Sequence, residues 1–483
     1  MVAATCLLVL AGCGGSSGHT DWPLPNLDLA STRSLAGSGI DRGNVGSLHV
    51  AWRFRFPVPP GESGAFTATP VVAGGVVYLQ DMRSNVYALD LESGKLLWRR
   101  RFNANNPGPN GLAVGDNRVY GATDASAFAL DAATGRTLWR HFLVTASARY
   151  VDMAPQVANG FVYLSTIGLP PNGRGILYGL DADTGAIRWR RSTIARAWRV
   201  PSEAGGGGAW QTPSVAAGTI FWGTSNPYPY GGTRAHPNGG AYAGVALYTD
   251  SLMAVDAATG RLVWYDQVTP HDVRDYDFQL PPIVGSSGGR DAVFGAGKAG
   301  LVVAWDRSTH ERVWQSQVGV HRNDRGLLPL RPVSVCPGLL GGVLTPMASG
   351  GGRLYVPVVD LCMRGSAIGF EPLDHVNVAQ RGRGELVALD AATGRKIWTL
   401  RLAQPDFGCA TVADGVVFTS TFDGRVYGVD AADGRILWSA SLRAGVNACP
   451  ALAAKTLLVG AGVPTHGHAE LELTAFRVSS SAA

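Results

Sequence analysis

The strongest constraint on the fold is a pattern that occurs seven times along the 483 residues. Residues 86–98, Val-Tyr-Ala-Leu-Asp-Leu-Glu-Ser-Gly-Lys-Leu-Leu-Trp, show one copy. In every copy a tryptophan follows an aspartate by eight residues. The aspartates are Asp90, Asp131, Asp181, Asp256, Asp306, Asp390 and Asp430, and the tryptophans are Trp98, Trp139, Trp189, Trp264, Trp314, Trp398 and Trp438. A fixed pattern of this kind indicates one supersecondary unit used repeatedly.

Each copy is typical of a β-hairpin. Residues 86–89 are β-branched, aromatic or aliphatic, as in a strand. Asp90 can accept backbone N–H groups in the turn, and Gly94 supplies the positive φ that closes it. Trp98 lies on the returning strand, where we expect it to be buried against a neighbouring sheet. His310 replaces the glycine in the fifth copy, which predicts a more strained turn. The repeated aspartates and tryptophans are therefore interpreted as structural.

The spacing of the copies predicts a closed ring. Copies start about 40 to 84 residues apart, and a four-stranded propeller blade needs roughly 40–50 residues, so the longer gaps contain insertions. Residues 49–52 resemble the Trp-bearing half of a copy, and residues 471–478 resemble the first half. Pairing these two segments would complete an eighth blade and remove exposed sheet edges. We predict an all-β, eight-bladed propeller of four-stranded antiparallel blades, a single domain over residues 19–483.

Composition excludes few functions but agrees with this fold. The chain has 64 glycines, only 16% charged residues and a formal net charge of +5, as expected for a β-rich protein with tight turns. The densest basic stretch is Arg188, Arg190, Arg191, Arg196 and Arg199. We interpret it as a solvated edge or loop and expect no nucleic-acid partner. We expect a monomer.

The N-terminus resembles a bacterial lipoprotein signal. Its apolar run, within residues 1–13, is too short to span a bilayer. Residues 10–13, Leu-Ala-Gly-Cys, resemble a lipobox in which Cys13 becomes lipidated, and residues 14–18 would be a flexible tether. We therefore expect a signal peptide and tether over residues 1–18 and an extracytoplasmic protein with a lipid anchor to the membrane. The alternative is a plain secretory signal. Either signal allows disulfides in the mature chain.

Four cysteines remain after the signal, and four cysteines allow three pairings. Cys409 and Cys449 occupy equivalent positions in neighbouring copies, and Cys336 and Cys362 flank the start of one blade. We predict the disulfides 336–362 and 409–449. No Cys-x-x-Cys-His motif occurs, so we expect no covalently attached haem.

Three insertions interrupt the repeats, at residues 196–248, 319–344 and 363–384. The first is rich in glycine, proline and aromatic residues. Long loops on a rigid scaffold commonly carry function, so we expect the functional site on the face that bears these insertions.

Two segments carry a family resemblance beyond the repeat itself. They are residues 44–52, ending Ala-Trp, and residues 269–277, Thr-Pro-His-Asp-Val-Arg-Asp-Tyr-Asp. Over nearly the whole mature chain, the sequence resembles the pyrroloquinoline-quinone-dependent alcohol dehydrogenases, which are eight-bladed propellers. The resemblance implies an extracytoplasmic quinoprotein dehydrogenase with pyrroloquinoline quinone and calcium as cofactors. Such an enzyme would oxidise an alcohol or sugar hydroxyl and pass the electrons to an external acceptor.

The resemblance assigns roles to four residues. Asp275 matches the general base that takes the hydroxyl proton and, with Asn226, a calcium ligand. Trp210 matches the residue on which the quinone stacks, and Lys298 matches the cation that polarises a quinone oxygen. Each residue also has a structural interpretation: a satisfied buried carboxylate, an Asx turn before Pro227, a core tryptophan and a solvated hairpin lysine.

The chain departs from the family pattern at several positions. Arg274 stands where a tryptophan precedes the catalytic aspartate, and Thr67 stands where an acidic residue is expected. Asn110 replaces an arginine, and Pro170 lies near the place of a calcium-binding glutamate. No adjacent Cys-Cys pair is present. Without an arginine partner, a tricarboxylate cofactor would bind less well. These departures favour a second hypothesis: a non-enzymatic propeller, similar to outer-membrane assembly scaffolds, that binds envelope proteins.

Overall fold

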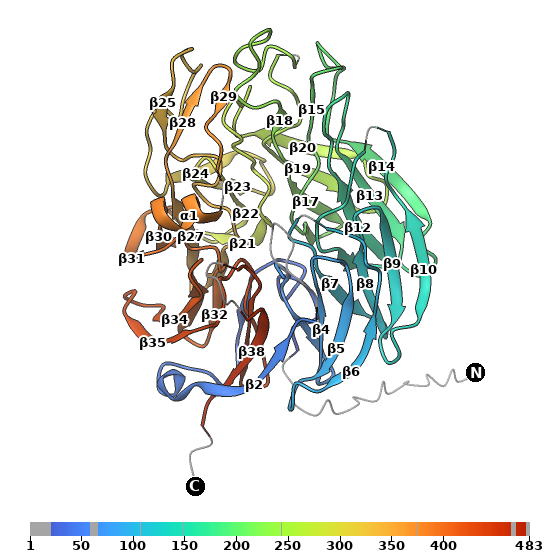
Figure 1. The fold of residues 1–483 in the computed structure, drawn as a ribbon, viewed down its shortest axis with the longest axis vertical. Coiled ribbons are helices and arrows are strands. Elements are labelled where there is room, and N and C mark those ends of the chain that lie inside the picture. The colour runs from blue at the N-terminus through green and yellow to red at the C-terminus, as the bar shows by residue number, and fades with distance from the viewer. Residues whose placement is uncertain are drawn as a thin grey trace, which may run out of the picture.

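The computed structural model describes residues 21–57, 66–106, 108–146, 148–242, 244–373, 375–464 and 470–479, with backbone only at 375–377. The predicted signal peptide and tether (1–18), including Cys13, lie outside the described residues. The chain forms a ring of eight four-stranded antiparallel sheets, which confirms the predicted eight-bladed propeller (Figure 1).

The first four blades follow one another in chain order. Blade 1 comprises β3 (Val71–Ala73), β4 (Val76–Gln80), β5 (Val86–Asp90) and β6 (Leu96–Arg100). Blade 2 comprises β7 (Leu112–Gly115), β8 (Arg118–Ala122), β9 (Ser126–Asp131) and β10 (Thr137–Phe142). Blade 3 comprises β11 (Gln156–Ala158), β12 (Phe161–Thr166), β13 (Ile176–Asp181) and β14 (Ile187–Ser192). Blade 4 comprises β16 (Ser214–Ala216), β17 (Thr219–Gly223), β19 (Ser251–Asp256) and β20 (Leu262–Gln267).

The next three blades continue the ring. Blade 5 comprises β21 (Ile283–Ser287), β22 (Arg290–Gly297), β23 (Leu301–Asp306) and β24 (Arg312–Gln317). Blade 6 comprises β26 (Ala348–Gly350), β27 (Arg353–Asp360), β30 (Arg383–Asp390) and β31 (Lys396–Leu402). Blade 7 comprises β32 (Thr411–Ala413), β33 (Val416–Ser420), β34 (Arg425–Asp430) and β35 (Ile436–Ser441), and β1 (Ser34–Leu35) pairs with β32 in parallel.

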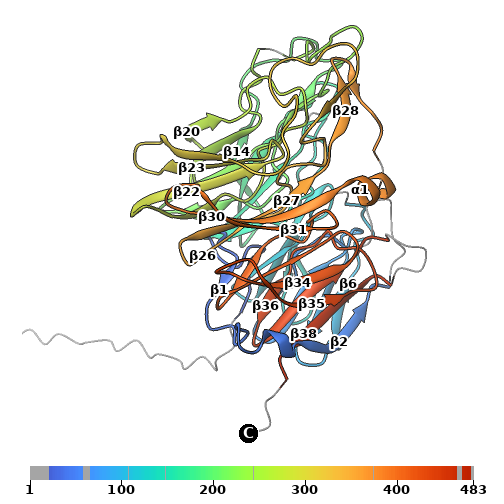
Figure 2. The same ribbon diagram turned by 90° about the vertical axis from the view of Figure 1, so that its left-hand side faces the viewer.

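Blade 8 joins the two ends of the chain. It comprises β36 (Ala451–Ala453), β37 (Thr456–Ala461), β38 (Glu472–Arg477) and, as its outermost strand, β2 (His49–Arg55), which follows a 3-10 turn (Val45–Ser47). Strand β2 runs antiparallel to β38, with Trp52 opposite Ala475. The two strands lie side by side at the bottom of Figures 1 and 2. The predicted ring closure is therefore confirmed, and it pairs the strand edges that an open ring would expose.

The repeated Trp and Gly link each blade to the next. The indole N–H of Trp98 donates to the Ala132 carbonyl of the following blade at 3.0 Å, and five other repeat tryptophans and Trp52 make equivalent bonds. A Cβ on Gly135 would lie 2.5 Å from the Trp98 ring. The turn glycine therefore provides positive φ (69°) and also the flat surface on which the preceding Trp packs.

In the fifth copy a histidine, rather than a glycine, packs against the preceding Trp. His310 takes the glycine position with φ 65°, the left-handed conformation expected to be strained in a histidine. Its ring stacks on Trp264 of the preceding blade, with centroids 5.0 Å apart and planes 16° apart. The stacking replaces the Trp–Gly contact between blades 4 and 5.

The N-terminal segment closes the centre of the ring on one side. Its backbone pairs with the inner strands of seven blades, through Val72, Val114, Val215, Val284, Ser349, Val412 and the turn residue Lys455. Arg33 of this segment is fully buried, and its guanidinium makes hydrogen bonds to Ala410, Pro25, Asn26, Thr411 and Pro450. Burial lowers the pKa of Arg33 to about 9. The segment therefore makes the centre of the propeller a closed funnel rather than a channel.

The three insertions contain β15 (Gly205–Gly206), β18 (Pro227–Tyr228), β25 (Val333–Val335), β28 (Met363–Ser366), β29 (Gly369–Phe370) and α1 (His375–Arg381). Their strands gather at one end of the molecule, at the top of Figure 1, and α1 lies lower, near β27 and β30. The backbone N–H of Asn238 donates to Ala367, which joins the first insertion to the third. The disulfide between Cys336 and Cys362 joins the second to the third. Together they build up the rim above the funnel.

The second disulfide, between Cys409 and Cys449, connects blades 7 and 8. Both predicted cysteine pairings are therefore confirmed. Within the described part of the chain, no helix has the length and apolar character needed to cross a bilayer.

Candidate active site

A cavity of about 480 Å³ lies at the centre of the ring, above the floor formed by the N-terminal segment. Pro25 and Asn26 of that segment line it, together with residues of several blades and of the insertions. All four residues assigned by resemblance, Trp210, Asn226, Asp275 and Lys298, lie in its wall. Loops far apart in the sequence therefore place these side chains around one space.

Asp275 lies in the loop between β20 and β21, which a second aspartate organises. The Asp272 carboxylate accepts the backbone N–H groups of Arg274 at 2.8 Å and Tyr276 at 2.6 Å, on either side of Asp275. Asp275 itself has φ 65°. Such sparsely populated backbone conformations cluster at functional sites. The hydrogen bonds of Asp272 hold this conformation in place.

Lys298 follows β22 and bridges two carboxylates. Its Nζ lies 2.8 Å from Asp275 Oδ2 and 2.6 Å from Asp277 Oδ2. The three side chains are 10%, 14% and 0% exposed, for Lys298, Asp275 and Asp277 respectively. The backbone N–H of Lys298 also donates to the Asp277 carbonyl at 3.0 Å. The ammonium is thus fixed between the two acids by the main chain as well as by charge.

Burial and this ion pair set the protonation of the site. Burial raises the pKa of Asp275 to about 8, against the opposing effect of the Lys298 ammonium. Burial disfavours the charged form of Lys298, but the two carboxylates outweigh that effect and raise its pKa. Burial, then the charge of Asp275, raises the pKa of Tyr230 to about 12. A carboxylate with a pKa near the working pH is suited to general-base catalysis.

Asn226 lies between β17 and β18 and is held by Asp277. Its backbone N–H donates to Asp277 Oδ1 at 2.8 Å, and its Nδ2 donates to the Pro227 carbonyl at 2.9 Å. The second bond fixes the amide so that Oδ1 remains an acceptor. Asp277 therefore connects the loop of Asn226 to the loop of Asp275.

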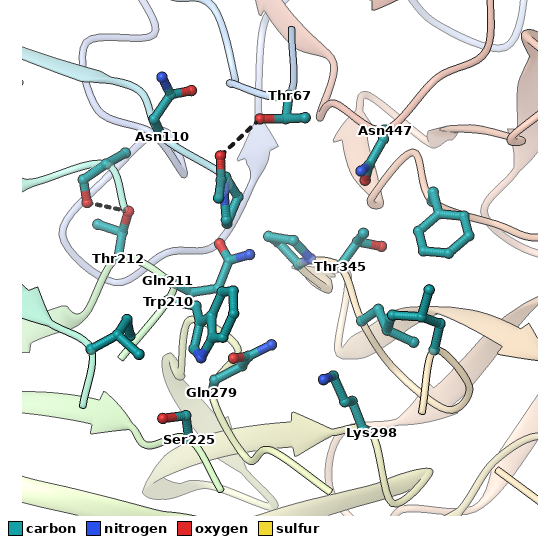
Figure 3. Close-up of a pocket in the computed structure, with 18 of the residues that line it drawn as sticks. Thr67, Asn110, Trp210, Gln211, Thr212, Ser225, Gln279, Lys298, Thr345 and Asn447 are labelled. Carbon is teal, nitrogen blue, oxygen red and sulfur yellow. Dashed lines mark hydrogen bonds between the residues drawn. The ribbon is translucent and has the colours of Figure 1, made fainter. Parts of the chain in front are cut away.

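Trp210 borders the cavity close to Gln279, Gln211 and Lys298, as Figure 3 shows. Several polar atoms of the wall are buried without a hydrogen-bond partner among the described residues: Trp210 Nε1, Thr345 Oγ1, Gln279 Oε1 and Asn110 Oδ1. Buried polar groups are normally hydrogen-bonded. Their presence in a cavity wall indicates a site for a polar ligand.

Asn110 lines the cavity but has no positive charge. Its Nδ2 donates to the Asp81 carbonyl at 2.8 Å, and its Oδ1 is buried without a hydrogen-bond partner among the described residues. The neighbouring Thr67 hydroxyl donates to the Gly108 carbonyl at 3.1 Å. Both side chains therefore offer acceptor oxygens on this side, where the resemblance implies an arginine and an acid.

Positive charge in the described cavity wall comes from Lys298 alone. Arg274 is directed away from the cavity, since its guanidinium donates to the carbonyls of Asn323, Arg325 and Gly326. Arg33 lies behind the floor with hydrogen bonds to five acceptors, so its five N–H groups are satisfied. It adds a positive field but no direct hydrogen bond to a ligand.

The opposite wall of the cavity is largely apolar. It is formed by Leu340, Leu344, Val378, Phe407 and Phe422, with the disulfide of Cys409 and Cys449 beside them. A ligand in the cavity would therefore meet polar groups on one side and hydrocarbon on the other.

The sequence interpretation missed three buried acids. Asp277 belongs to the quoted motif but was assigned no role, although it contacts both Lys298 and Asn226. Neither carboxylate oxygen of Asp152 or Asp250 has a partner among the described residues, and burial raises the pKa of both well above the usual range. The Asp-x-Asp spacing of residues 275 and 277 could have indicated a role for Asp277. No local sequence motif marks Asp152 or Asp250.

The wall fits a flat quinone better than it fits calcium. The cavity volume, the free indole N–H of Trp210 and the Lys298 ammonium suit a planar molecule with carbonyl oxygens. Calcium requires six to eight oxygen ligands, but the ammonium already lies between the two carboxylates. Among the described residues, no group of three or more His, Cys, Asp or Glu side chains is arranged to hold a metal. The donor set therefore does not fit the expected calcium ion.

Comparisons with known proteins agree with this geometry. A family model described as outer membrane protein assembly factor BamB matches residues 44–227 and 298–482. A second, described as glucose/ethanol/alcohol dehydrogenase, beta-propeller domain, matches residues 168–321, the segment that contains all four assigned residues.

The individual relatives include alcohol dehydrogenases, and the solved structures show the same fold. The quinohemoprotein alcohol dehydrogenase of Comamonas testosteroni is 28% identical, over 89% of this chain and 70% of its own length. Its structure matches 96% of this chain and 81% of its own, with a TM-score of 0.81 and 23% identity. Alcohol dehydrogenase ADH IIB of Pseudomonas putida is 30% identical over 49% of this chain and 38% of its own length. BamB of Moraxella catarrhalis matches with a TM-score of 0.56 and 15% identity, over 89% of this chain and 99% of its own.

Proposed function

Because the chain belongs to the propeller family of the pyrroloquinoline-quinone-dependent alcohol dehydrogenases, we propose that it is an extracytoplasmic dehydrogenase that oxidises an alcohol or sugar hydroxyl with pyrroloquinoline quinone. The observation that carries this proposal is the presence of Asp275, Lys298 and Trp210 in the wall of one cavity. The two disulfides support an extracytoplasmic location.

Each residue has a role that follows from its surroundings. Trp210 provides the flat surface and a free N–H for the cofactor. Lys298 donates a charge-assisted hydrogen bond to a quinone oxygen. Asp275 accepts the proton of the substrate hydroxyl. The bound quinone supplies the two-electron acceptor for the substrate hydride. The electrons then pass to an external acceptor.

The apolar wall keeps water from the reacting hydroxyl. Leu340, Leu344 and Phe407 leave few polar partners for solvent on that side. Exclusion of water strengthens the electrostatic interactions of Asp275 and Lys298 in the cavity.

Titration of pyrroloquinoline quinone into the purified full-length protein tests the proposal. We expect one quinone per chain, with quenching of tryptophan fluorescence, and at least tenfold weaker binding in Trp210→Ala. Asp275→Asn should still bind quinone but lose oxidation of alcohols with an artificial electron acceptor. Absence of quinone binding by the wild-type chain would reject the proposal.

The second candidate is a non-enzymatic scaffold of the cell envelope. The match of the assembly-factor family model to residues 44–227 and 298–482 favours it. The open cavity and its unpartnered polar groups favour the enzyme, since a scaffold that binds partners on its outer face does not need them. Rejection of quinone binding would leave the scaffold as the remaining hypothesis.

A further inference from the structure

The position that a metal ion would take between Asp275, in the cavity wall, and the fully buried Asp277 behind it is filled by a side chain. Lys298 Nζ lies 2.8 Å from Asp275 Oδ2 and 2.6 Å from Asp277 Oδ2. These separations are only slightly longer than the 2.3–2.6 Å of calcium–oxygen bonds. Asn226 lines the same cavity, and its backbone N–H donates to Asp277 Oδ1, so its amide oxygen is a further candidate oxygen ligand in this region.

The lysine is held there by the backbone. A Cβ on Gly297 would lie 2.2 Å from the Asp277 carbonyl oxygen, and a Cβ on Gly342 would lie 2.1 Å from the Lys298 carbonyl oxygen. These close approaches, with the hydrogen bond from Lys298 N–H to the Asp277 carbonyl, fix the start of the side chain. The ammonium therefore does not depend on a flexible surface conformation to reach the two carboxylates.

A divalent cation cannot share this position with the ammonium. Lys298 Nζ occupies the space between Asp275 Oδ2 and Asp277 Oδ2, and a second cation bound there would be repelled strongly in a site with little solvent. The third-blade position that could add a carboxylate is near Pro170. Both the charge and the small number of ligands favour a single cation at this position, and the Lys298 ammonium is that cation.

We propose that the Lys298 ammonium takes the place of the divalent cation in this protein, so that the cavity binds and activates its ligand without a metal ion. The ammonium would position Asp275 and donate to an oxygen of the ligand, the two tasks that a metal ion would otherwise perform. The inference deepens the proposed function and rests on it for the identity of the ligand. Its test contains no quinone, so that failure of either can be distinguished.

Removing the ammonium should expose a latent metal site. In Lys298→Met the long apolar side chain preserves packing while the carboxylates of Asp275 and Asp277 lose their counter-ion. Two carboxylates and the Asn226 amide oxygen then remain as hard oxygen ligands, the type that calcium prefers. The double variant Lys298→Met/Asp277→Asn is the matched control, because it lacks the lysine but keeps only one of the two carboxylates.

The experiment measures bound metal and thermal stability of the full-length protein at alkaline pH, with calcium, with lanthanum and with a chelator. We expect no retained metal in the wild type and the same Tm in all three conditions. Lys298→Met should retain one calcium or lanthanum per chain and gain several degrees in Tm with the metal. The double variant should lose this gain. Circular dichroism establishes that each variant is folded.

Either of two results would overturn the inference. The first is stoichiometric calcium or lanthanum in the wild type, or a fall in its Tm with chelator. The second is a folded Lys298→Met variant that binds neither ion. If Lys298→Met does not fold, the wild-type metal content decides alone.

Discussion

The Lys298 ammonium lies 2.8 Å from the Asp275 carboxylate, and both side chains face the central cavity while remaining almost inaccessible to solvent. Two opposing effects act on the protonation of Asp275. Burial favours its neutral form, and the Lys298 ammonium favours its charged form. Burial is the larger effect, and the pKa of Asp275 is raised to about 8. The candidate base is thus partly protonated at neutral pH.

The first prediction concerns the pH dependence of alcohol oxidation. Asp275 can accept a proton only when it is ionised, so kcat/KM should rise about tenfold per pH unit at low pH and level off above about pH 8. Asp275→Asn should reduce kcat by about 10²–10⁴-fold. Steady-state rates with an artificial acceptor measure both. A pH-independent rate across this range in the wild type would contradict the assignment of Asp275.

The second prediction concerns residue 110, where the family pattern has an arginine that could bind a cofactor carboxylate and this chain has Asn110. Asn110 lines the cavity, its Nδ2 is bonded to the Asp81 carbonyl, and its Oδ1 is buried without a partner among the described residues. Asn110→Arg would add a donor for a cofactor carboxylate, and hydrogen bonds to charged groups contribute about 1.5–3 kcal/mol. Affinity for pyrroloquinoline quinone should therefore increase about 10–100-fold, measured by calorimetric titration.

The matched control for this change is Asn110→Leu. It removes the acceptor oxygen but adds no charge, so its gain in affinity should be much smaller. An equal gain in the two variants would show that removal of the acceptor, rather than the new cation, is responsible.

The fold could be predicted because its determinants recur. The Asp–Trp spacing fixes one hairpin, and its repetition fixes the ring, including the pairing of Trp52 with Ala475 across the chain ends. The same register argument placed Cys409 and Cys449 in neighbouring blades, where they form a disulfide. Features that recur in every blade can therefore be predicted from the sequence.

The site could be predicted only in part, because its loops have no repeat. Resemblance located Trp210, Asn226, Asp275 and Lys298, and all four line the cavity. The sequence could not predict how side chains are oriented. The amide of Asn110, for example, is fixed by its hydrogen bond to the Asp81 carbonyl. The ion pair between Lys298 and Asp277 depends on the path of an irregular loop between β20 and β21. These contacts are the basis of our proposal that an ammonium takes the place of the calcium ion.

The third prediction concerns the disulfide in the cavity wall. Replacing Cys409 and Cys449 by serine opens a cross-link between residues 40 apart, which should lower the free energy of unfolding by about 2–4 kcal/mol. Because both cysteines line the cavity, affinity for the quinone should also fall. Guanidinium denaturation and quinone titration measure the two effects.

The disulfide between Cys336 and Cys362 provides the control. It lies in the insertions and outside the lining of the cavity. Its replacement by serines should destabilise the protein without changing quinone affinity. Loss of affinity in this variant would show that affinity follows overall stability rather than the disulfide that lines the cavity.

The fourth prediction concerns stability and a buried acid that does not itself line the cavity. Asp406 is 1% exposed, and its Oδ1 accepts the Thr419 hydroxyl at 2.6 Å and the Gly408 N–H at 3.4 Å. Its Oδ2 has no partner among the described residues. Burial raises the pKa of Asp406 to about 8. An unfolded aspartate titrates near about 3.9.

The sign of the pH effect follows from proton binding. Between about pH 4 and pH 8 the folded chain keeps a proton on Asp406 that the unfolded chain has released, so rising pH favours unfolding in this window. Asp406→Asn stays neutral and retains the acceptor for Thr419. The variant should be more stable than the wild type near pH 8, and the difference should shrink towards pH 4. The comparison is thermal unfolding across this range, with the exposed Asp116→Asn as the charge control. Parallel curves for Asp406→Asn and the wild type would show that Asp406 is ionised in the folded protein.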